Sequence, residues 1–248
     1  MSSMIDPQNI IPKYYQLANI LRDQIENGAF AEQEAIPSER QLEEKFNLSR
    51  PTIRQAIDIL ERQGFVYRVH GRGTFVSPHK LQMGTQELTS FSEDMRSRGL
   101  EPGQRILVFE MVTPPKKAAI QLEIADPNQQ VLRIKRLRFG GAEPIGIQDS
   151  YLALSKGQTI TMEEMEAQGS IYTILQSKYG IFPTEAEETV EVTIATPEEA
   201  ELLRIPVGGP LLLNVRTLWS QDRKAVEYVR ILYRGDRYKY LVRLARKH

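Results

Sequence analysis

The chain has 248 residues, of which 41% are hydrophobic and 26% are charged, and its formal net charge at neutral pH is zero. This composition is typical of a folded protein of one large or two modest domains and argues against wholesale disorder. There is no run of about 18 apolar residues, which predicts no transmembrane helix, and the lack of cysteine excludes disulfides, thiolate zinc sites and a cysteine nucleophile. Residues 1–12 lack the basic start of a signal peptide, so we expect a cytoplasmic protein.

Charge is unevenly distributed along the first third of the chain. Residues 23–44 carry seven acidic side chains against one basic one, whereas residues 45–80 carry seven basic side chains against two acidic ones, a local charge of +5 (7 − 2). A chain that is neutral overall can therefore present a basic face to nucleic-acid phosphates. Ordinary local fluctuation of composition is the alternative explanation.

Three helices are predicted in the first 64 residues. Apolar residues between Tyr14 and Ile25 recur at the spacing of an amphipathic helix. Ser38 followed by Gln41 is a capping-box pattern that begins a second, short helix. Ser49 can cap the third helix.

A hairpin is predicted after the third helix. Residues 65–69 and 74–76 have strand character, and the glycine-rich residues 70–73 connect them. The order helix, helix, tight turn, helix, hairpin is that of a winged helix-turn-helix. We expect this DNA-binding domain to span residues 1–77.

The third helix is predicted to enter the major groove, as the second helix of a helix-turn-helix does. Arg50 and Arg54 share one face of this helix, where arginine can grip guanine with two hydrogen bonds and Gln55 can pair with adenine. The free N–H groups at helix starts can bind phosphate oxygens, and a glycine-rich wing can enter a minor groove. The predicted DNA-binding residues are Ser38, Arg40, Ser49, Arg50, Thr52, Arg54, Gln55, His70, Gly71 and Arg72. The alternative is that these are solvated charges on a small helical domain.

These segments resemble the GntR superfamily of bacterial transcription regulators. The resemblance is carried by PSERQL (37–42), SRPTIRQA (49–56) and HGRGTFV (70–76), and it covers roughly residues 10–77. It implies that the protein binds operator DNA as a homodimer. It also implies DNA contacts from Arg40, Arg50, Arg54 and Gly71, and phosphate contacts from Ser49 and Thr52.

Beyond a predicted linker at residues 78–88, residues 89–248 are expected to form a second domain. Helices are predicted near residues 90–98, 115–122, 170–179 and 197–204, and strands at 104–113, 130–140, 143–154, 184–195, 210–220 and 223–234. Strands that follow one another closely favour an antiparallel sheet, so the predicted fold class is α+β.

Alternate residues of a strand share a face, and this alternation marks a candidate ligand site. In residues 131–139 the even positions are apolar until Arg136 and Arg138, and buried arginines need an anion. In residues 225–233 Glu227 is the lone acid on an apolar face. Pairing of either arginine with Glu191 or Glu227 is the structural alternative.

A predicted helix start adds to this site. Ser170 opens the helix that carries Tyr172, and a helix N-terminus favours phosphate. Arginine beside a helix start suggests a phosphorylated ligand, whereas glutamate with tyrosine suggests a polyol or an amino sugar.

The second domain resembles the HutC-like subfamily, whose effector domain has the chorismate-lyase-like α+β fold. The resemblance is carried by LTSFSEDM (88–95), EYV (227–229) and YRGDRY (233–238) and covers most of residues 85–245. In phosphosugar-binding members the matching positions here are Phe91 and Ser92 in a loop, Arg136, Arg138, Ser170, Tyr172, Glu227 and Tyr233. Gln148 stands where those members can carry glutamate near the sugar, which leaves the identity of the sugar open.

The sequence therefore predicts a transcription regulator, a repressor that a phosphorylated sugar or amino sugar releases from its operator. We hypothesise that the ligand reorders the linker and changes the separation of the two recognition helices, whose half-sites lie ~34 Å apart. The prediction includes no catalytic residue, metal, cofactor or membrane partner.

A small carboxylate as effector is one alternative. An enzyme that processes a phosphosugar or aromatic acid is another, although the chain has no P-loop, H-E-x-x-H or nucleophile elbow. An architectural DNA-binding protein would leave Arg136, Arg138 and Glu227 unexplained.

Overall fold

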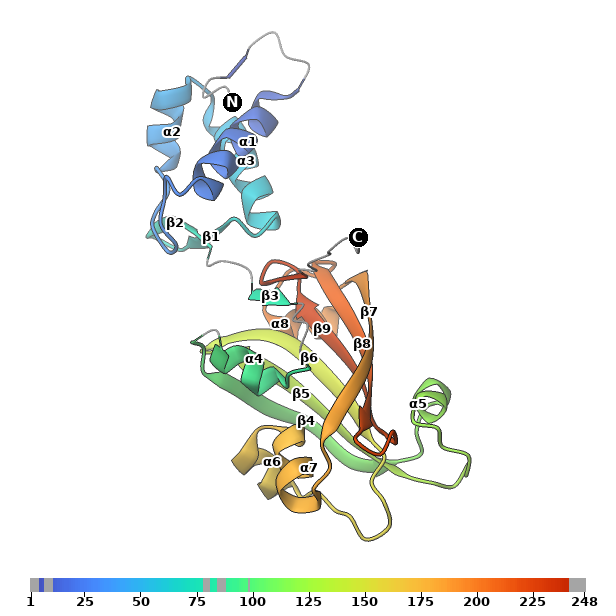
Figure 1. Cartoon of the computed structure of the whole chain (residues 1–248). Coiled ribbons are helices and arrows are strands. Elements are labelled where there is room, and N and C mark those ends of the chain that lie inside the picture. Colours follow the sequence, from blue (N-terminus) through green and yellow to red (C-terminus); the bar gives the residue numbers. More distant parts are fainter. Residues whose placement is uncertain (1–4, 7–10, 78–80, 84–87, 98, 241–248) are drawn as a thin grey trace, which may run out of the picture. The chain divides into compact units, whose positions relative to one another are not determined.

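The computed structural model describes residues 5–6, 11–77, 81–83, 88–97 and 99–240 (Figure 1). The chain divides into two compact units, residues 1–81 and 82–248, and each is described by itself. Residues 78–80 and 84–87 of the predicted linker lie outside the described residues. No helix in the described ranges is long and apolar enough to cross a membrane.

The N-terminal unit is a three-helix domain with a β-hairpin, as predicted. Its helices are α1 (Lys13–Glu26), α2 (Glu39–Phe46) and α3 (Arg50–Arg62), and its hairpin pairs β1 (Val66–Val69) with β2 (Gly73–Val76). The apolar faces of all five elements meet in one core that includes Leu17, Leu42, Ile57 and Val76. This core fixes the helices, so their opposite faces are left to solvent.

Helix starts in this unit differ in how they are capped. Ser38 and Gln41 form the predicted capping box at the start of α2. Ser49 precedes α3, but its hydroxyl does not cap a backbone N–H; it lies 2.9 Å from the hydroxyl of Thr52 instead. The predicted cap is wrong because Thr52, at the third position of the helix, offers a competing side-chain partner.

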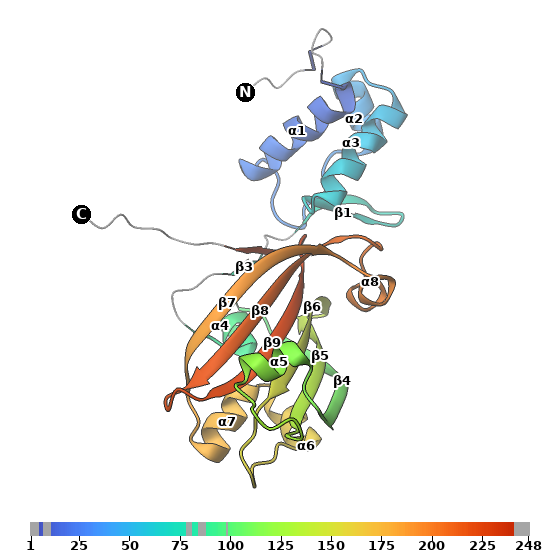
Figure 2. The same ribbon diagram turned by 90° about the vertical axis from the view of Figure 1, so that its right-hand side faces the viewer.

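The C-terminal unit is built on a six-stranded antiparallel sheet of order β4-β5-β6-β9-β8-β7 (Figures 1 and 2). The strands are β4 (Pro102–Val112), β5 (Val131–Gly140), β6 (Glu143–Leu152), β7 (Pro183–Ile194), β8 (Pro210–Ser220) and β9 (Ala225–Arg234). All six predicted strands are present, with ends that differ by at most two residues. The α+β prediction is confirmed.

Helices cover both faces of this sheet. On the face of the even β5 residues, α6 (Met162–Gln168) and α7 (Ile171–Tyr179) enclose Leu132 and Ile134. On the opposite face, α5 (Lys116–Gln121) and α8 (Pro197–Leu203) contribute to cores around Val131 and Leu137. The remaining helix, α4 (Phe91–Ser97), lies where a helix was predicted near residues 90–98. It begins with Phe91 and Ser92, which the family resemblance had placed in a loop.

Three elements of the described structure were not predicted from the sequence. They are α6 and the short strands β3 (Leu81–Met83) and β10 (Tyr238–Tyr240), which pair with each other. β3 lies inside the range predicted as linker. Strands of three residues carry too little alternation to be seen in a sequence.

Candidate DNA interface and effector site

Helix α3, which we predicted to be the recognition helix, separates an apolar face from a basic one. Ile53, Ala56, Ile57 and Leu60 are buried, whereas Arg50, Arg54 and Gln55 are exposed. Helical periodicity produces this division, because residues four apart lie one above the other. The two arginines therefore project together from the first two turns of α3, as predicted from their spacing.

One carboxylate holds both arginines. Nε of Arg50 and Nε of Arg54 lie 3.0 and 3.1 Å from Oε2 of Glu39, the first residue of α2. The arginine side chains remain 63% and 57% exposed. Partial burial alone would raise the pKa of Glu39, but its hydrogen bonds to Arg50 and Arg54 outweigh this effect and lower the pKa. Glu39 was not among the predicted residues, although it stands beside Arg40 in the capping-box run.

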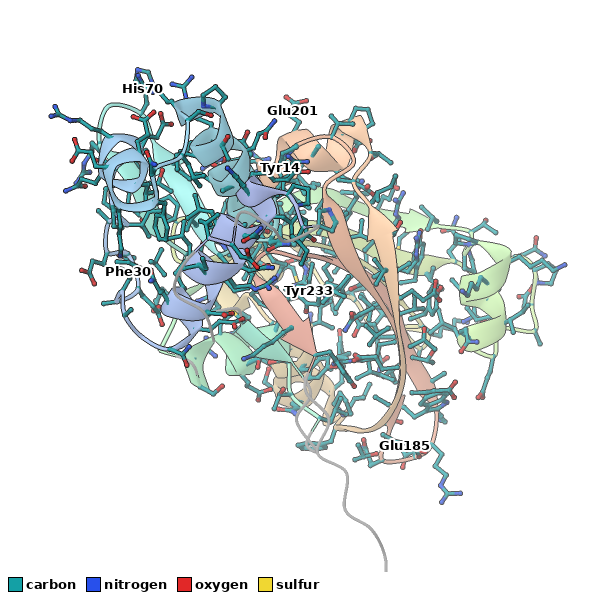
Figure 3. The ribbon with its side chains drawn as sticks, turned by 90° about the horizontal axis from the view of Figure 1, so that it is seen from above. Tyr14, Phe30, His70, Glu185, Glu201 and Tyr233 are labelled. Carbon is teal, nitrogen blue, oxygen red and sulfur yellow. The ribbon has the colours of Figure 1, made fainter. Side chains whose placement is uncertain are left out.

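The remaining predicted DNA-binding residues also lie on the surface of this unit. Arg40 forms an ion pair with Glu44 at 3.0 Å. His70 and Arg72 are exposed in the β1–β2 turn, and His70 is labelled at the periphery of the unit in Figure 3. Gly71 has φ of +71°, a left-handed conformation that side chains rarely adopt. The wing tip can thus bring its backbone close to a DNA strand.

In the C-terminal unit, strand pairing gathers the predicted ligand residues on one face of the sheet. Arg136 is the register partner of Gln148, and Arg138 is that of Gly146, which in turn pairs with Tyr233. A side chain at Gly146 would lie 2.9 Å from the carbonyl oxygen of Leu232 and 3.0 Å from the Tyr233 ring. Glycine at this position lets the tyrosine ring lie across β6.

The two arginines are buried, each 2% exposed, as alternation predicted. Arg138 lies over the Phe91 ring at 3.9 Å and donates to the Ser92 hydroxyl and the Gly169 carbonyl, both at 3.4 Å. Burial lowers the pKa of Arg136 to about 10. Burial and the charge of Arg136 together lower the pKa of Arg138.

Neither arginine forms a salt bridge with a carboxylate of the described residues, so the structural alternative of pairing with Glu191 or Glu227 is not observed. The Nε atoms of both arginines are buried without a hydrogen-bond partner in the described part of the chain. Buried cations of this kind need an anion.

A cavity of about 450 Å³ adjoins this face of the sheet. It is lined by Ser90, Phe91, Gln148, Tyr172, Glu188, Arg216, Glu227 and Tyr233, among others; Tyr233 and Glu185, both in the lining, are labelled in Figure 3. Arg136, Arg138, Ser92 and Ser170 line a recess of about 20 Å³, which shares Phe91, Gln148, Tyr172 and Glu227 with the cavity. The structure thus brings every predicted ligand residue to one continuous site.

Glu227 is the buried acid of the site. Its Oε1 has no hydrogen-bond partner among the described residues, and neither has Oε1 of Gln148. Burial raises the pKa of Glu227, against the opposing effects of a hydrogen bond with Ser150 and the charge of Arg136. Both free oxygens can accept hydrogen bonds from a ligand.

Ser170 and Tyr172 belong to the start of α7. The Ser170 hydroxyl caps this helix by accepting from the backbone N–H of Thr173 at 3.3 Å. Burial raises the pKa of Tyr172, so this phenol stays protonated and can donate. The residues from 170 onward thus place a helix N-terminus beside Arg138, where an anion is favoured.

Several residues of the site were not predicted, and three of them form hydrogen bonds or an ion pair there. Gln104 accepts hydrogen bonds from Arg136 and Arg138, at 3.2 and 2.9 Å. Arg216 and Glu188 form a salt bridge of 2.5 Å in the cavity lining. All three are cross-strand neighbours of cavity-facing positions, so their places depend on the register between strands, which alternation within one strand does not give.

A site with two buried arginines that form no salt bridge among the described residues, a helix start and a buried acid is suited to binding a polar anion. Within the described ranges, no cluster of histidine, cysteine, aspartate or glutamate could hold a metal ion. A winged helix with exposed arginines and a separate unit with a polar cavity together define a DNA-binding regulator that senses a small molecule.

Comparison with known proteins gives the family. Residues 13–76 match the bacterial regulatory proteins of the gntR family, and residues 97–239 match the UTRA domain. The chain belongs to the gntR family of transcription regulators and carries a UTRA effector domain, and it is not an enzyme.

Its relatives support this membership over the full length of the chain. It is 38% identical to the HTH-type transcriptional repressor NagR of Bacillus subtilis, covering 96% of each chain. It is 28% identical to the mannosyl-D-glycerate transport/metabolism system repressor MngR of Escherichia coli, covering 95% of this chain and 97% of MngR. The crystal structure of PhnF from Mycobacterium smegmatis is similar with a TM-score of 0.62 at 26% identity, covering 93% of this chain and 100% of PhnF.

Proposed function

We propose that this regulator is a cytoplasmic homodimeric repressor that a phosphorylated sugar or amino sugar releases from operator DNA. The observation that carries the proposal is the pair Arg136 and Arg138, buried at 2% exposure with no salt bridge to a carboxylate of the described residues. A phosphate group supplies both the charge and the oxygen acceptors that these guanidinium groups lack. The relation to the repressor NagR at 38% identity supports the same direction of control.

The rest of the cavity suits a sugar. Glu227 and Gln148 present acceptor oxygens without partners in the described chain, and hydroxyl or ammonium groups are their natural donors. The recess beside the arginines, about 20 Å³, has room for about one water-sized group. A phosphate is larger than this, so side chains that line the recess must move for it to reach the arginines; Phe91, which lies against Arg138 at the start of α4, is one of them.

We assign the DNA contacts to the surface of the N-terminal unit. Arg50, Arg54 and Gln55 are proposed to read base edges, Ser38, Arg40, Ser49 and Thr52 to contact phosphates, and His70, Gly71 and Arg72 to reach the adjacent groove. We retain residues 1–77, 78–88 and 89–248 as DNA-binding domain, linker and effector domain.

Thermal unfolding with a panel of small molecules tests the effector class. The panel contains hexose 6-phosphates, hexosamine 6-phosphates and small carboxylates. A ligand at a hundredfold excess over its Kd should stabilise the fold by about 2.7 kcal/mol. The expected result is stabilisation by a sugar phosphate together with release of bound DNA in a gel-shift assay. Stabilisation by a carboxylate alone would contradict the phosphosugar proposal and favour the carboxylate alternative.

A further inference from the structure

A single amide joins the two buried arginines. Oε1 of Gln104, on β4, accepts from Nη1 of Arg136 at 3.2 Å and from Nη1 of Arg138 at 2.9 Å. Its Nε2 donates to the backbone carbonyl of Met165 at 2.6 Å. Because a carbonyl can only accept, the amide nitrogen must face Met165 and the oxygen must face the arginines. The orientation of Gln104 is therefore determined by its surroundings.

The neutrality of this acceptor is the unusual feature. Buried arginines in proteins are ordinarily paired with carboxylates, and arginine keeps its proton. Here an amide satisfies one N–H of each guanidinium group and neutralises neither. Arg138 is also destabilised as a cation by the charge of Arg136 beside it. Glu227, the buried acid of the site, acts electrostatically on both arginines but forms no salt bridge with either in the described part of the chain. Because the amide adds no negative charge of its own, the pair still favours an incoming anion.

We propose that Gln104 sets the charge selectivity of the effector site: its amide orients Arg136 and Arg138 but leaves both charges for a doubly charged anion. The site then prefers the dianion of a phosphate monoester to a singly charged sulfate ester or carboxylate. Gln104 acts through the arginines and is a positioning residue. The inference rests on the proposed function, that the cavity binds a phosphorylated sugar.

Calorimetric titration of the full-length protein with two matched esters tests the preference. Glucosamine 6-phosphate changes from one to two negative charges on its ester group with a pKa of about 6. Glucosamine 6-sulfate keeps a single negative charge on that group throughout. For the wild type, we expect the affinity for the phosphate to rise about tenfold between pH 5 and pH 7, as the dianion becomes the main form.

The sulfate ester controls for titration of the protein. The charged and titratable groups around the recess and cavity are Arg136, Arg138, Asp94, Tyr172, Glu185, Glu188, Arg216, Glu227, Tyr233 and Tyr240. All of them act on both esters, so a change in their protonation would alter the affinities for phosphate and sulfate in the same direction. A slope seen only with the phosphate therefore comes from the ligand's second charge.

Two substitutions separate charge from shape. Gln104→Glu keeps the size of the side chain and places a carboxylate between the arginines. It should weaken phosphate binding at pH 7 at least about tenfold and abolish the preference over sulfate, since one of the two charges is then compensated internally. Gln104→Met removes the acceptor without adding charge. It should weaken both esters by a similar factor and leave the pH slope of the phosphate intact.

The outcomes are distinguishable. Equal binding of both esters by the wild type, or an unchanged preference in a folded Gln104→Glu variant, would overturn the role of Gln104 while the sugar-phosphate proposal stands. Binding of neither ester, with a carboxylate bound instead, would overturn both. If circular dichroism shows that Gln104→Glu does not fold, the pH dependence of phosphate affinity in the wild type and in Gln104→Met tests the inference instead. Loss of that pH dependence in Gln104→Met would contradict the inference.

Discussion

The two units of this regulator each hold a pair of arginines on a single acceptor, in opposite environments. Arg50 and Arg54 are four residues apart on a helix, 63% and 57% exposed, and they share the carboxylate of Glu39. Arg136 and Arg138 are two residues apart on a strand, 2% exposed, and they share the amide of Gln104. The spacings differ because side chains repeat about every four residues on a helix face and every two on a strand face.

The difference suits the two kinds of binding that we propose for these arginines. At the surface, an ion pair contributes only about 0–1 kcal/mol, so DNA can displace Glu39 at little cost. In the interior, an acid between the arginines would compete strongly with an incoming anion. An acidic acceptor is therefore compatible with the exposed pair, and a neutral one with the buried pair.

The largest expected effect comes from breaking the buried pair. Arg138→Ala should raise the Kd of glucosamine 6-phosphate by at least about thirtyfold, since loss of a buried charged hydrogen-bonding group costs about 2–5 kcal/mol. Operator binding without ligand should be unchanged. Arg133→Ala is the matched control, because Arg133 lies on the opposite face of β5 and pairs with Asp149. Calorimetry and gel-shift assays measure the two properties, and retained release of DNA by the variant would remove Arg138 from the site.

Breaking the exposed pair should have a smaller effect. Arg54→Ala should weaken specific operator binding by about 1–3 kcal/mol, the loss expected for one bidentate base contact. Arg62→Ala, in the last turn of the same helix, should change affinity far less. Fluorescence anisotropy at fixed salt, on DNA selected from a random library with the wild-type protein, compares the variants. Equal affinity of Arg54→Ala and wild type would contradict the assignment of α3 as the recognition helix.

Sequence periodicity predicted both pairs of arginines but neither of their acceptors. The arginines are visible because their spacing is local and their neighbours are apolar at the same period. Glu39 lies 11 and 15 residues from Arg50 and Arg54, and Gln104 lies 32 and 34 residues from Arg136 and Arg138. Such partners are set by how helices pack and how strands pair, which periodicity within one element does not contain.

Helix-capping patterns in the sequence predicted helix starts only in part. The start of α6 carries the capping-box pair Thr161 and Glu164, so a search for that pattern alone would have located the missed helix. Ser49 shows the reverse case, since its sequence context favours a cap that the Thr52 hydroxyl prevents. The six strands of the main sheet were predicted well because their alternation extends over ten residues or more.

The smallest expected effect would come from making the exposed pair resemble the buried one. Glu39→Gln replaces the carboxylate between Arg50 and Arg54 with an amide. Operator affinity should rise about two- to fivefold, because DNA no longer has to displace surface ion pairs that are each worth less than about 1 kcal/mol. The salt dependence of binding should become steeper by up to about one unit of log K per log salt. Titrations at several salt concentrations measure both.

Glu43→Gln is the matched control, since it removes the same charge from α2 without freeing either arginine. If Glu39→Gln strengthens binding more than this control does, Glu39 restrains the recognition helix in the absence of DNA. Weaker binding by Glu39→Gln would instead show that the carboxylate orients Arg50 and Arg54 for the major groove. Paired with Gln104→Glu, this substitution exchanges the acceptors of the two sites. The two responses should be opposite in sign, because one substitution removes a carboxylate and the other adds one. The effect at position 104 should be the larger, because water screens a carboxylate at the surface but not in the effector cavity.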